Sequence, residues 1–171
     1  MKPNDFALKT VKLDGTLQLY VPRPKKVNEI LKPTSGFQYT VIWTSTAQKT
    51  QSGYTSAWVE WCSMSMPQWL TNKGTLYKVS PGAKVLSMNT DKDAFAIAKY
   101  YGIEPPKSDI EKLLWARNFP WDEIEDDYDG IHHEPSGSRF ANILMSTWDV
   151  ESTAWFNTNH LQQMGEVRVS P

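Results

Sequence analysis

The sequence predicts a single domain of the α+β class. Its 171 residues suffice for one ordinary hydrophobic core, and two independent domains would be a tight fit. Short β-prone segments occur in pairs, and three short helical segments are mixed among them without a regular βαβ alternation. We therefore expect mixed β-sheets with short peripheral helices, all within residues 1–171.

Residues 1–36 are predicted to form a hairpin followed by a connector. Apolar and polar residues alternate over 6–21, and Asp14 and Gly15 lie between the two alternating runs. An Asp-Gly pair in this place favours a β-hairpin, because both central positions of a type I′ turn need positive φ. Pro22 should end the second strand, and a lysine-rich connector follows it.

The predicted core covers residues 37–171 and begins with its most β-prone segment, residues 37–43. This segment should be a central strand, followed directly by polar residues. Residues 54–62 should begin as a strand and continue as a helix, because their apolar residues change to a helical spacing. Two more short strands are expected at 75–79 and 83–88, separated by a Pro-Gly turn.

Helical signals follow in the next part of the chain. Thr90 is a suitable N-cap and Gly102 a suitable stop for the first helix. A capping box predicts a second helix over 108–117. A third, short helix is expected over 121–127, with the preceding proline in its first turn.

The last part of the chain should return to β-structure. Strands are expected from residue 131 and over 139–145 and 152–156. The polar residues that follow should cap a single helical turn over 157–164, and residues 166–169 should form a closing strand.

Charge and cysteine content narrow the classes of function. The net charge of −1 and the pI near 6.3 give no basic excess of the kind that nonspecific nucleic-acid binding requires. Cys62 is the only cysteine, which excludes an intramolecular disulfide and suits a reducing compartment. The chain has no apolar run of membrane-spanning length and no apolar segment at its start, so a cytoplasmic protein without a membrane partner is expected.

Aromatic and histidine residues have two interpretations each. Eight Trp, seven Tyr and six Phe could pack the core and sheets, or could wall a cleft that stacks on a flat ligand. His132 and His133 are adjacent on an expected strand and should point to opposite faces, so we expect no metal site. Nucleotide-binding loops, nucleophile elbows and zinc-protease motifs are absent from the sequence.

Five short segments follow one another in a characteristic order. They are VIWTST at 41–46, YTSAW at 54–58, LYKV at 76–79, YDGI at 128–131 and ESTAWFN at 151–157. This order resembles the ADP-ribosyltransferase superfamily, particularly its compact bacterial and phage members, over roughly residues 37–170. The resemblance implies a split cleft between mixed sheets. Members usually carry an Arg or a His on the first core strand, and residues 37–43 have neither.

The resemblance implies NAD as a substrate and assigns roles to seven residues. Cleavage of the bond between ribose and nicotinamide develops an oxocarbenium-like cation, which a carboxylate can stabilise. Glu151 would supply this carboxylate. The other residues would bind NAD, with hydroxyls on ribose and phosphate and an aromatic ring on nicotinamide: Thr44, Ser45, Tyr54, Thr55, Ser56 and Trp58.

Several alternatives remain at this point. Glu151 could be a solvent-facing acid at the start of a strand, and Asp149 competes with it because alternation puts both on one face. Tyr128, Asp129 and Gly130 fit a structural turn. The expected function is NAD-dependent ADP-ribosyl transfer by a phage or mobile-element effector to a host macromolecule in the host cytoplasm.

Two other functions compete with ADP-ribosyl transfer. The first is a non-catalytic scaffold of the same fold that binds a protein or a nucleotide as an inhibitor. The second is a nuclease that uses His132 or His133 as a general base, which the near-neutral charge disfavours.

Overall fold

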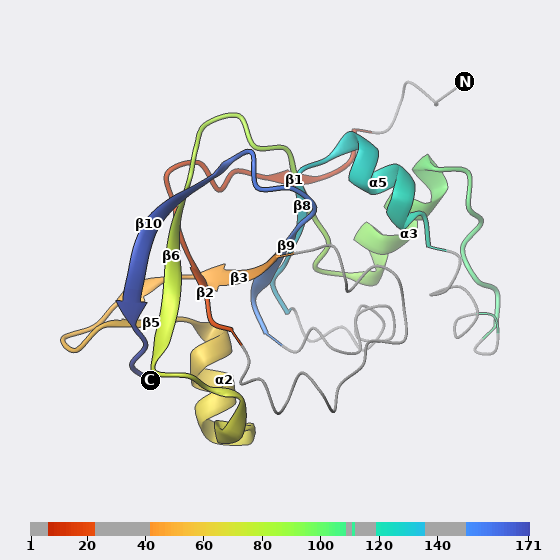
Figure 1. Cartoon of the computed structure of the whole chain (residues 1–171). Coiled ribbons are helices and arrows are strands. Elements are labelled where there is room, and N and C mark those ends of the chain that lie inside the picture. The colour runs from red at the N-terminus through yellow and green to blue at the C-terminus, as the bar shows by residue number, and fades with distance from the viewer. Residues whose placement is uncertain (1–6, 23–41, 109–110, 112–118, 136–149) are drawn as a thin grey trace.

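Eight strands form one curled sheet, in the order β1-β7-β8-β9-β3-β2-β6-β10 (Figure 1). The computed structural model describes residues 7–22, 42–108, 111, 119–135 and 150–171. In chain order the strands of the sheet are β1 (Thr10–Val11), β2 (Leu17–Tyr20), β3 (Ile42–Thr46), β6 (Lys73–Val79), β7 (Val85–Ser87), β8 (Gly130–His133), β9 (Ser152–Trp155) and β10 (Leu161–Arg168). Among the described strands of this sheet, β7 and β8 pair in parallel and the other neighbours pair antiparallel.

The remaining elements lie outside this sheet. They are the small hairpin β4 (Gln48–Lys49) and β5 (Tyr54–Thr55), the helices α2 (Ala57–Ser65), α3 (Asp91–Tyr100) and α5 (Trp121–Asp127), and the 3₁₀ turn η2 (Pro67–Trp69). In Figure 1, α3 and α5 lie together and apart from α2. The described part of the chain is therefore α+β, as the sequence predicts.

The predicted N-terminal hairpin is wrong, although its turn exists. Gly15 has a φ of 76°, as a left-handed turn position requires. However, β1 pairs with β7, whereas β2 pairs with β3 and β6. The reason is that the turn is hydrogen-bonded to the end of β6, through Gly15 N to Val79 O (2.8 Å) and Val79 N to Thr16 O (3.0 Å). The turn thus separates two strands instead of joining them.

The most β-prone segment does contribute a central strand. Its described part begins at Ile42, and residues 37–41 lie outside the described residues. The strand continues through Thr44, Ser45 and Thr46 and pairs with β9 on one side and β2 on the other. The polar residues expected to follow the strand are therefore its last three members.

The change from strand to helix at residues 54–62 is confirmed. β5 ends at Thr55, and Ser56 caps α2 by accepting a hydrogen bond from Val59 N at 3.4 Å. Thr90 likewise caps α3 and forms a reciprocal capping box with Asp93. The chain leaves this helix just before Gly102, which has a φ of 78°.

One further helix is present, and two other predictions fall mainly outside the described residues. The short helix after Pro120 is present as α5. The helix over 108–117 lies outside the described residues except for Ser108 and Glu111, and the strand over 139–145 lies wholly outside them.

The helical turn predicted over 157–164 is wrong. Asn157 Oδ1 accepts a hydrogen bond from Asn159 N (3.1 Å), and Thr158 O accepts one from Leu161 N (3.0 Å), so the polar residues close a turn rather than cap a helix. The chain then enters β10, which pairs along β6 with an irregularity between Gln163 and Gly165. Pairing with β6 overrides the local helical preference.

Three buried clusters hold these elements together. The largest lies between the helices α3 and α5 and the strands β7, β8 and β9, and includes Ile97, Ile124 and Ile131. A second is centred on Trp155, whose side chain is almost completely buried, and a third packs α2 against β2 through Val59 and Leu19. Within the described residues, no helix is long and apolar enough to cross a membrane.

Candidate functional site

Glu151 lies immediately before β9, beside the end of β3. The two strands are antiparallel with Thr44 opposite Thr153, so the beginning of β9 meets the last residues of β3. The Glu151 side chain is 19% exposed, which leaves part of its carboxylate open to solvent. Strand pairing therefore fixes where this acid sits, and it is not a freely solvated surface group.

The Glu151 carboxylate accepts hydrogen bonds from both residues at the end of β3. Its Oε2 accepts from Thr46 N at 3.0 Å and from Ser45 Oγ at 2.8 Å. The Ser45 hydroxyl shares its one proton with the Glu151 backbone carbonyl, which is 2.7 Å away. Its Oε1 accepts from Thr46 Oγ1 at 2.8 Å. Hydrogen bonds of this kind fix the orientation of the carboxylate. Thr46 N also lies 3.4 Å from Oε1, so each carboxylate oxygen contacts two donors at the end of β3.

His132 is the second titratable group at this site. Its Nδ1 lies 2.9 Å from Thr153 Oγ1 and 3.7 Å from Glu151 Oε1. Burial lowers the pKa of His132 below its ordinary value; Glu151 and then Glu134 oppose this effect, and His133 adds slightly to it. The imidazole is therefore neutral at neutral pH, in contact with a neighbouring carboxylate.

A pocket of about 390 Å³ opens beside Glu151 and His132. Its other described lining residues are Leu13, Thr46, Gln48, Ala57 and Glu134. Among the lining residues that the structure describes, two are carboxylates and none is Lys or Arg, which favours a neutral or cationic ligand group over an anionic one.

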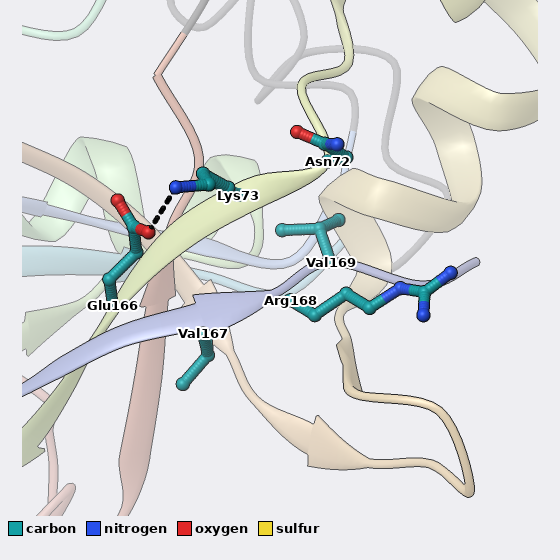
Figure 2. Close-up of a pocket in the computed structure, with 6 residues that line it drawn as sticks. All are labelled: Asn72, Lys73, Glu166, Val167, Arg168 and Val169. Atoms are coloured by element: carbon teal, nitrogen blue, oxygen red, sulfur yellow. Dashed lines mark ion pairs between the residues drawn. The ribbon is translucent and has the colours of Figure 1, made fainter.

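A second pocket, of about 420 Å³, lies along β6 and β10 and shares no lining residue with the first. Figure 2 shows that Lys73 and Glu166 reach across the two strands to each other, at 2.6 Å, while Arg168 extends away from this pair. These side chains are largely exposed, so this pocket is a shallow feature of the sheet surface rather than a built site.

The structure brings Ser45 together with Glu151 but directs Thr44 into the interior. Thr44 Oγ1 accepts a hydrogen bond from Trp155 Nε1 at 2.8 Å and donates one to Gln18 Oε1 at 2.8 Å. Neighbouring residues of a strand point to opposite sides, which explains why Thr44 and Ser45 have different surroundings.

The other four candidates lie near the pocket without being among its lining residues. Thr55 pairs with Gln48, a lining residue, but its buried Oγ1 has no hydrogen-bond partner among the described residues. Ser56 serves as the N-cap of α2. Tyr54 and Trp58 pack against the apolar cluster between α2 and β2, and Trp58 also stacks on Trp61 with ring centroids 5.3 Å apart.

Three residues of the site were not assigned to it from the sequence. Thr46 ends the segment in which Thr44 and Ser45 were chosen, and the sequence alone does not distinguish the three hydroxyls. His132 was considered only as a metal ligand or a nuclease base. Gln18 lies between two leucines, so alternation indicates a solvent-facing side chain; the curled sheet buries it instead.

The turn at Asp129 is structural. Asp129 Oδ2 accepts a hydrogen bond from Lys84 N at 2.8 Å, and Oδ1 accepts one from Asn157 Nδ2 at 3.0 Å. A Cβ atom at Gly130 would lie 2.6 Å from Ala154 O, so close packing of the backbones requires glycine there. The rival acid Asp149 lies outside the described residues.

The fold and the site define an α+β domain with a carboxylate and a neutral histidine at one small pocket. Within the described residues, no group of three or more His, Cys, Asp or Glu side chains could hold a metal ion. No protein-family model matches the chain, and comparisons with curated proteins and with solved structures find no significant match.

Proposed function

We propose that the protein is an NAD-dependent ADP-ribosyltransferase in which Glu151 is the essential carboxylate. The observation that carries the proposal is the fixed orientation of this acid, which Ser45 and Thr46 hold at the mouth of a pocket that His132 also lines. The cleft arrangement of the superfamily and a role as a phage or mobile-element effector on a host macromolecule, in the host cytoplasm, belong to the same proposal.

The proposed reaction gives each group a definite task. Nicotinamide leaves with the electron pair of its bond to ribose C1′, positive charge develops on the ribose, and a nucleophile of the target attacks C1′ and loses a proton. An ionised carboxylate stabilises the positive charge where it forms. His132, kept neutral by burial, has the protonation state needed to accept the proton of the nucleophile.

The pocket suits the nicotinamide and its ribose better than the diphosphate of NAD. Its volume of about 390 Å³ is within the range of ordinary ligand sites, about 300–1,000 Å³. Glu134 and Glu151 suit the cationic nicotinamide and the developing charge on ribose. The described lining residues offer no cation for the diphosphate, so we assign it no residue and expect it to lie outside this pocket.

The decisive experiment measures nicotinamide release from NAD by the purified protein. Glu151→Gln should reduce release by about 100-fold or more, because loss of one group that stabilises transition-state charge has effects of this order. The glutamine has nearly the same shape, so the variant should remain folded by circular dichroism. Glu166→Gln, in the second pocket, is the matched control and should leave release unchanged.

A lack of both nicotinamide release and calorimetric NAD binding at millimolar NAD would overturn the proposal. Equal release by wild type and Glu151→Gln would remove Glu151 from its role.

A non-catalytic binding protein is the second candidate, and the tryptophans of α2 and η2 favour it. Trp58, Trp61 and Trp69 form a cluster of partly buried rings with centroids 5.3–6.1 Å apart, and the nearby Met64 is 80% exposed. Aromatic and methionine side chains are enriched at protein interfaces.

Binding that survives Glu151→Gln but is lost in Met64→Asp would support this candidate. Binding that is lost only in Glu151→Gln would count against it.

A further inference from the structure

A continuous chain of hydrogen bonds connects the buried core to the Glu151 carboxylate. Trp155 Nε1 is 2.8 Å from Thr44 Oγ1, which is 2.8 Å from Gln18 Oε1. Gln18 Nε2 is 3.4 Å from Thr46 Oγ1, and Thr46 Oγ1 is 2.8 Å from Glu151 Oε1. Gln18 links β2 to β3 and is completely buried.

The two ends of this chain fix the direction of every bond in it. An indole N–H can only donate, so Thr44 Oγ1 accepts from Trp155 and has its own proton for Gln18 Oε1. This orientation turns the amide NH₂ of Gln18 toward Thr46. At the other end Thr46 Oγ1 donates to Glu151 Oε1, so the Thr46 hydroxyl proton points to Glu151.

A second hydrogen bond of the Gln18 amide, to Thr16, supports the same orientation of Gln18. Thr16 Oγ1 donates to Leu13 O at 2.7 Å, which leaves a lone pair for Gln18 Nε2 at 3.2 Å. The amide of Gln18 therefore has an acceptor for each of its two protons and a donor for its oxygen. The opposite amide orientation would place NH₂ against Thr44, whose proton then has no acceptor in the chain.

We propose that Gln18 and Thr44 are positioning residues, which hold the Thr46 hydroxyl as a fixed donor to the Glu151 carboxylate. Neither residue is among those lining the pocket, and their hydrogen bonds lead to Glu151 through Thr46. That this arrangement serves catalysis rests on the proposed function of Glu151, whereas the orienting effect itself does not. Buried and fully bonded networks of this kind are rigid, because each member has a single favourable orientation.

His132 provides a reporter of the chain that needs no enzymatic activity. Its Nδ1 lies 3.7 Å from Glu151 Oε1, the oxygen that Thr46 bonds. Loss of the Thr46 donor leaves more negative charge on this oxygen and so favours the imidazolium form. Glu134 and His133, which also act on the pKa of His132, are left unsubstituted in the variants compared below.

The experiment compares Thr46→Val, Thr44→Val and Thr44→Ser by NMR titration of the His132 ring and by the indole N–H resonance of Trp155. Thr46→Val removes the last link and should raise the His132 titration midpoint, by about 0.5 pH unit. Thr44→Val should raise it in the same direction by a smaller amount and also shift the indole resonance. Thr44→Ser retains the hydroxyl and should match the wild type.

An unchanged His132 midpoint in folded Thr44→Val, with a shifted midpoint in Thr46→Val, would overturn the proposal, because Thr44 would then be only a stabilising residue. Gln18→Met, of similar volume, breaks the chain at its centre and replaces Thr44→Val if that variant does not fold. If nicotinamide release occurs, Thr44→Val should lower kcat more than it changes KM. A normal His132 response without any release would count against the proposed function alone.

Discussion

Asp129 and Glu151 are carboxylates in closely similar settings, but Asp129 connects structural elements whereas Glu151 lines a pocket. Their side chains are 18% and 19% exposed, and each has a histidine nitrogen 3.7 Å away, from His160 and His132 respectively. Asp129 accepts hydrogen bonds from Lys84 N and the Asn157 side chain, and thereby ties the entrance of β7 to the turn before β10. Glu151 accepts from the end of one strand and lines a pocket.

The comparison teaches that a paired carboxylate and histidine do not by themselves identify a functional site. His160 has a side chain that is 28% exposed, whereas the side chain of His132 is 8% exposed and its pKa is lowered by burial. Burial of the histidine, a pocket at the acid and a bonded network behind it distinguish Glu151 from Asp129. These three properties depend on how distant strands meet.

The largest effect is expected from Gly130→Ala, beside Asp129. The added Cβ would lie 2.6 Å from Ala154 O, so β8 and β9 must separate, and we expect a loss of about 3 kcal/mol in the free energy of unfolding. Gly15→Ala is an informative control. Gly15 has a φ of 76° and no atom within 4 Å of the added Cβ, so only backbone strain of about 1 kcal/mol is expected there.

Urea denaturation of both variants measures this difference. Equal losses at the two glycines would contradict the close approach of β8 and β9.

Asp129→Ala should have the next largest effect, about 2 kcal/mol, because it removes two hydrogen bonds, from Lys84 N and from Asn157 Nδ2. Glu151→Gln should lose less stability, about 1 kcal/mol, since the amide keeps one oxygen and stands at a partly open site. Chemical denaturation with matched buffers checks both values. If Glu151→Gln were the more destabilising of the two, Glu151 rather than Asp129 would be the carboxylate with the larger structural role.

Much of the fold could be predicted from the sequence because local signals were strong. The Thr90 cap, the Ser56 transition from strand to helix and the Pro120 helix start each depend on neighbouring residues. The pairing of strands was less predictable. The Asp14-Gly15 turn gave a correct turn and a wrong hairpin, because long-range bonds to Val79 decide the partners of β1 and β2.

The site was predictable in part for the same reason. Glu151 and Ser45 were assigned through the resemblance, as an acid at the start of one strand and a hydroxyl at the end of another, and the antiparallel pairing of β3 and β9 brings them together. Gln18 could not be found, because its alternating pattern indicates exposure and only the curl of the sheet buries it. His132 lacked any signal that would place it beside an acid 19 residues later in the chain.

His132 should make stability depend on pH. Its folded-state pKa is lowered below the value of the unfolded chain, so the unfolded chain binds more protons in the interval between the two values. The contribution of neutral His132 to the free energy of unfolding is fully present above about pH 6.5. This contribution is lost as pH falls through the folded-state pKa. For one proton the slope cannot exceed about 1.4 kcal/mol per pH unit.

Denaturation midpoints measured from pH 7.5 to 5 test this expectation, with His132→Asn as the variant that cannot titrate. The slope should be smaller in His132→Asn than in the wild type. An identical slope in His132→Asn would show that another group causes the dependence.

The smallest effect is expected from Thr55→Val, which replaces a hydroxyl by a methyl group. Thr55 Oγ1 is buried without a hydrogen-bond partner among the described residues, so stability should change by less than about 0.5 kcal/mol or increase slightly. The same change at Thr44 should cost about 2 kcal/mol, because Trp155 Nε1 loses its acceptor in the core.

Thermal denaturation of the two valine variants therefore separates a hydroxyl within the network from one outside it. The result also bears on the ligand, because a hydroxyl without a protein partner can still serve a bound molecule. If Thr55→Val keeps full stability but weakens NAD binding in calorimetry, its hydroxyl is reserved for the ligand. If Thr55→Val loses as much stability as Thr44→Val, the hydroxyl has a structural partner and the contrast between the two threonines is wrong.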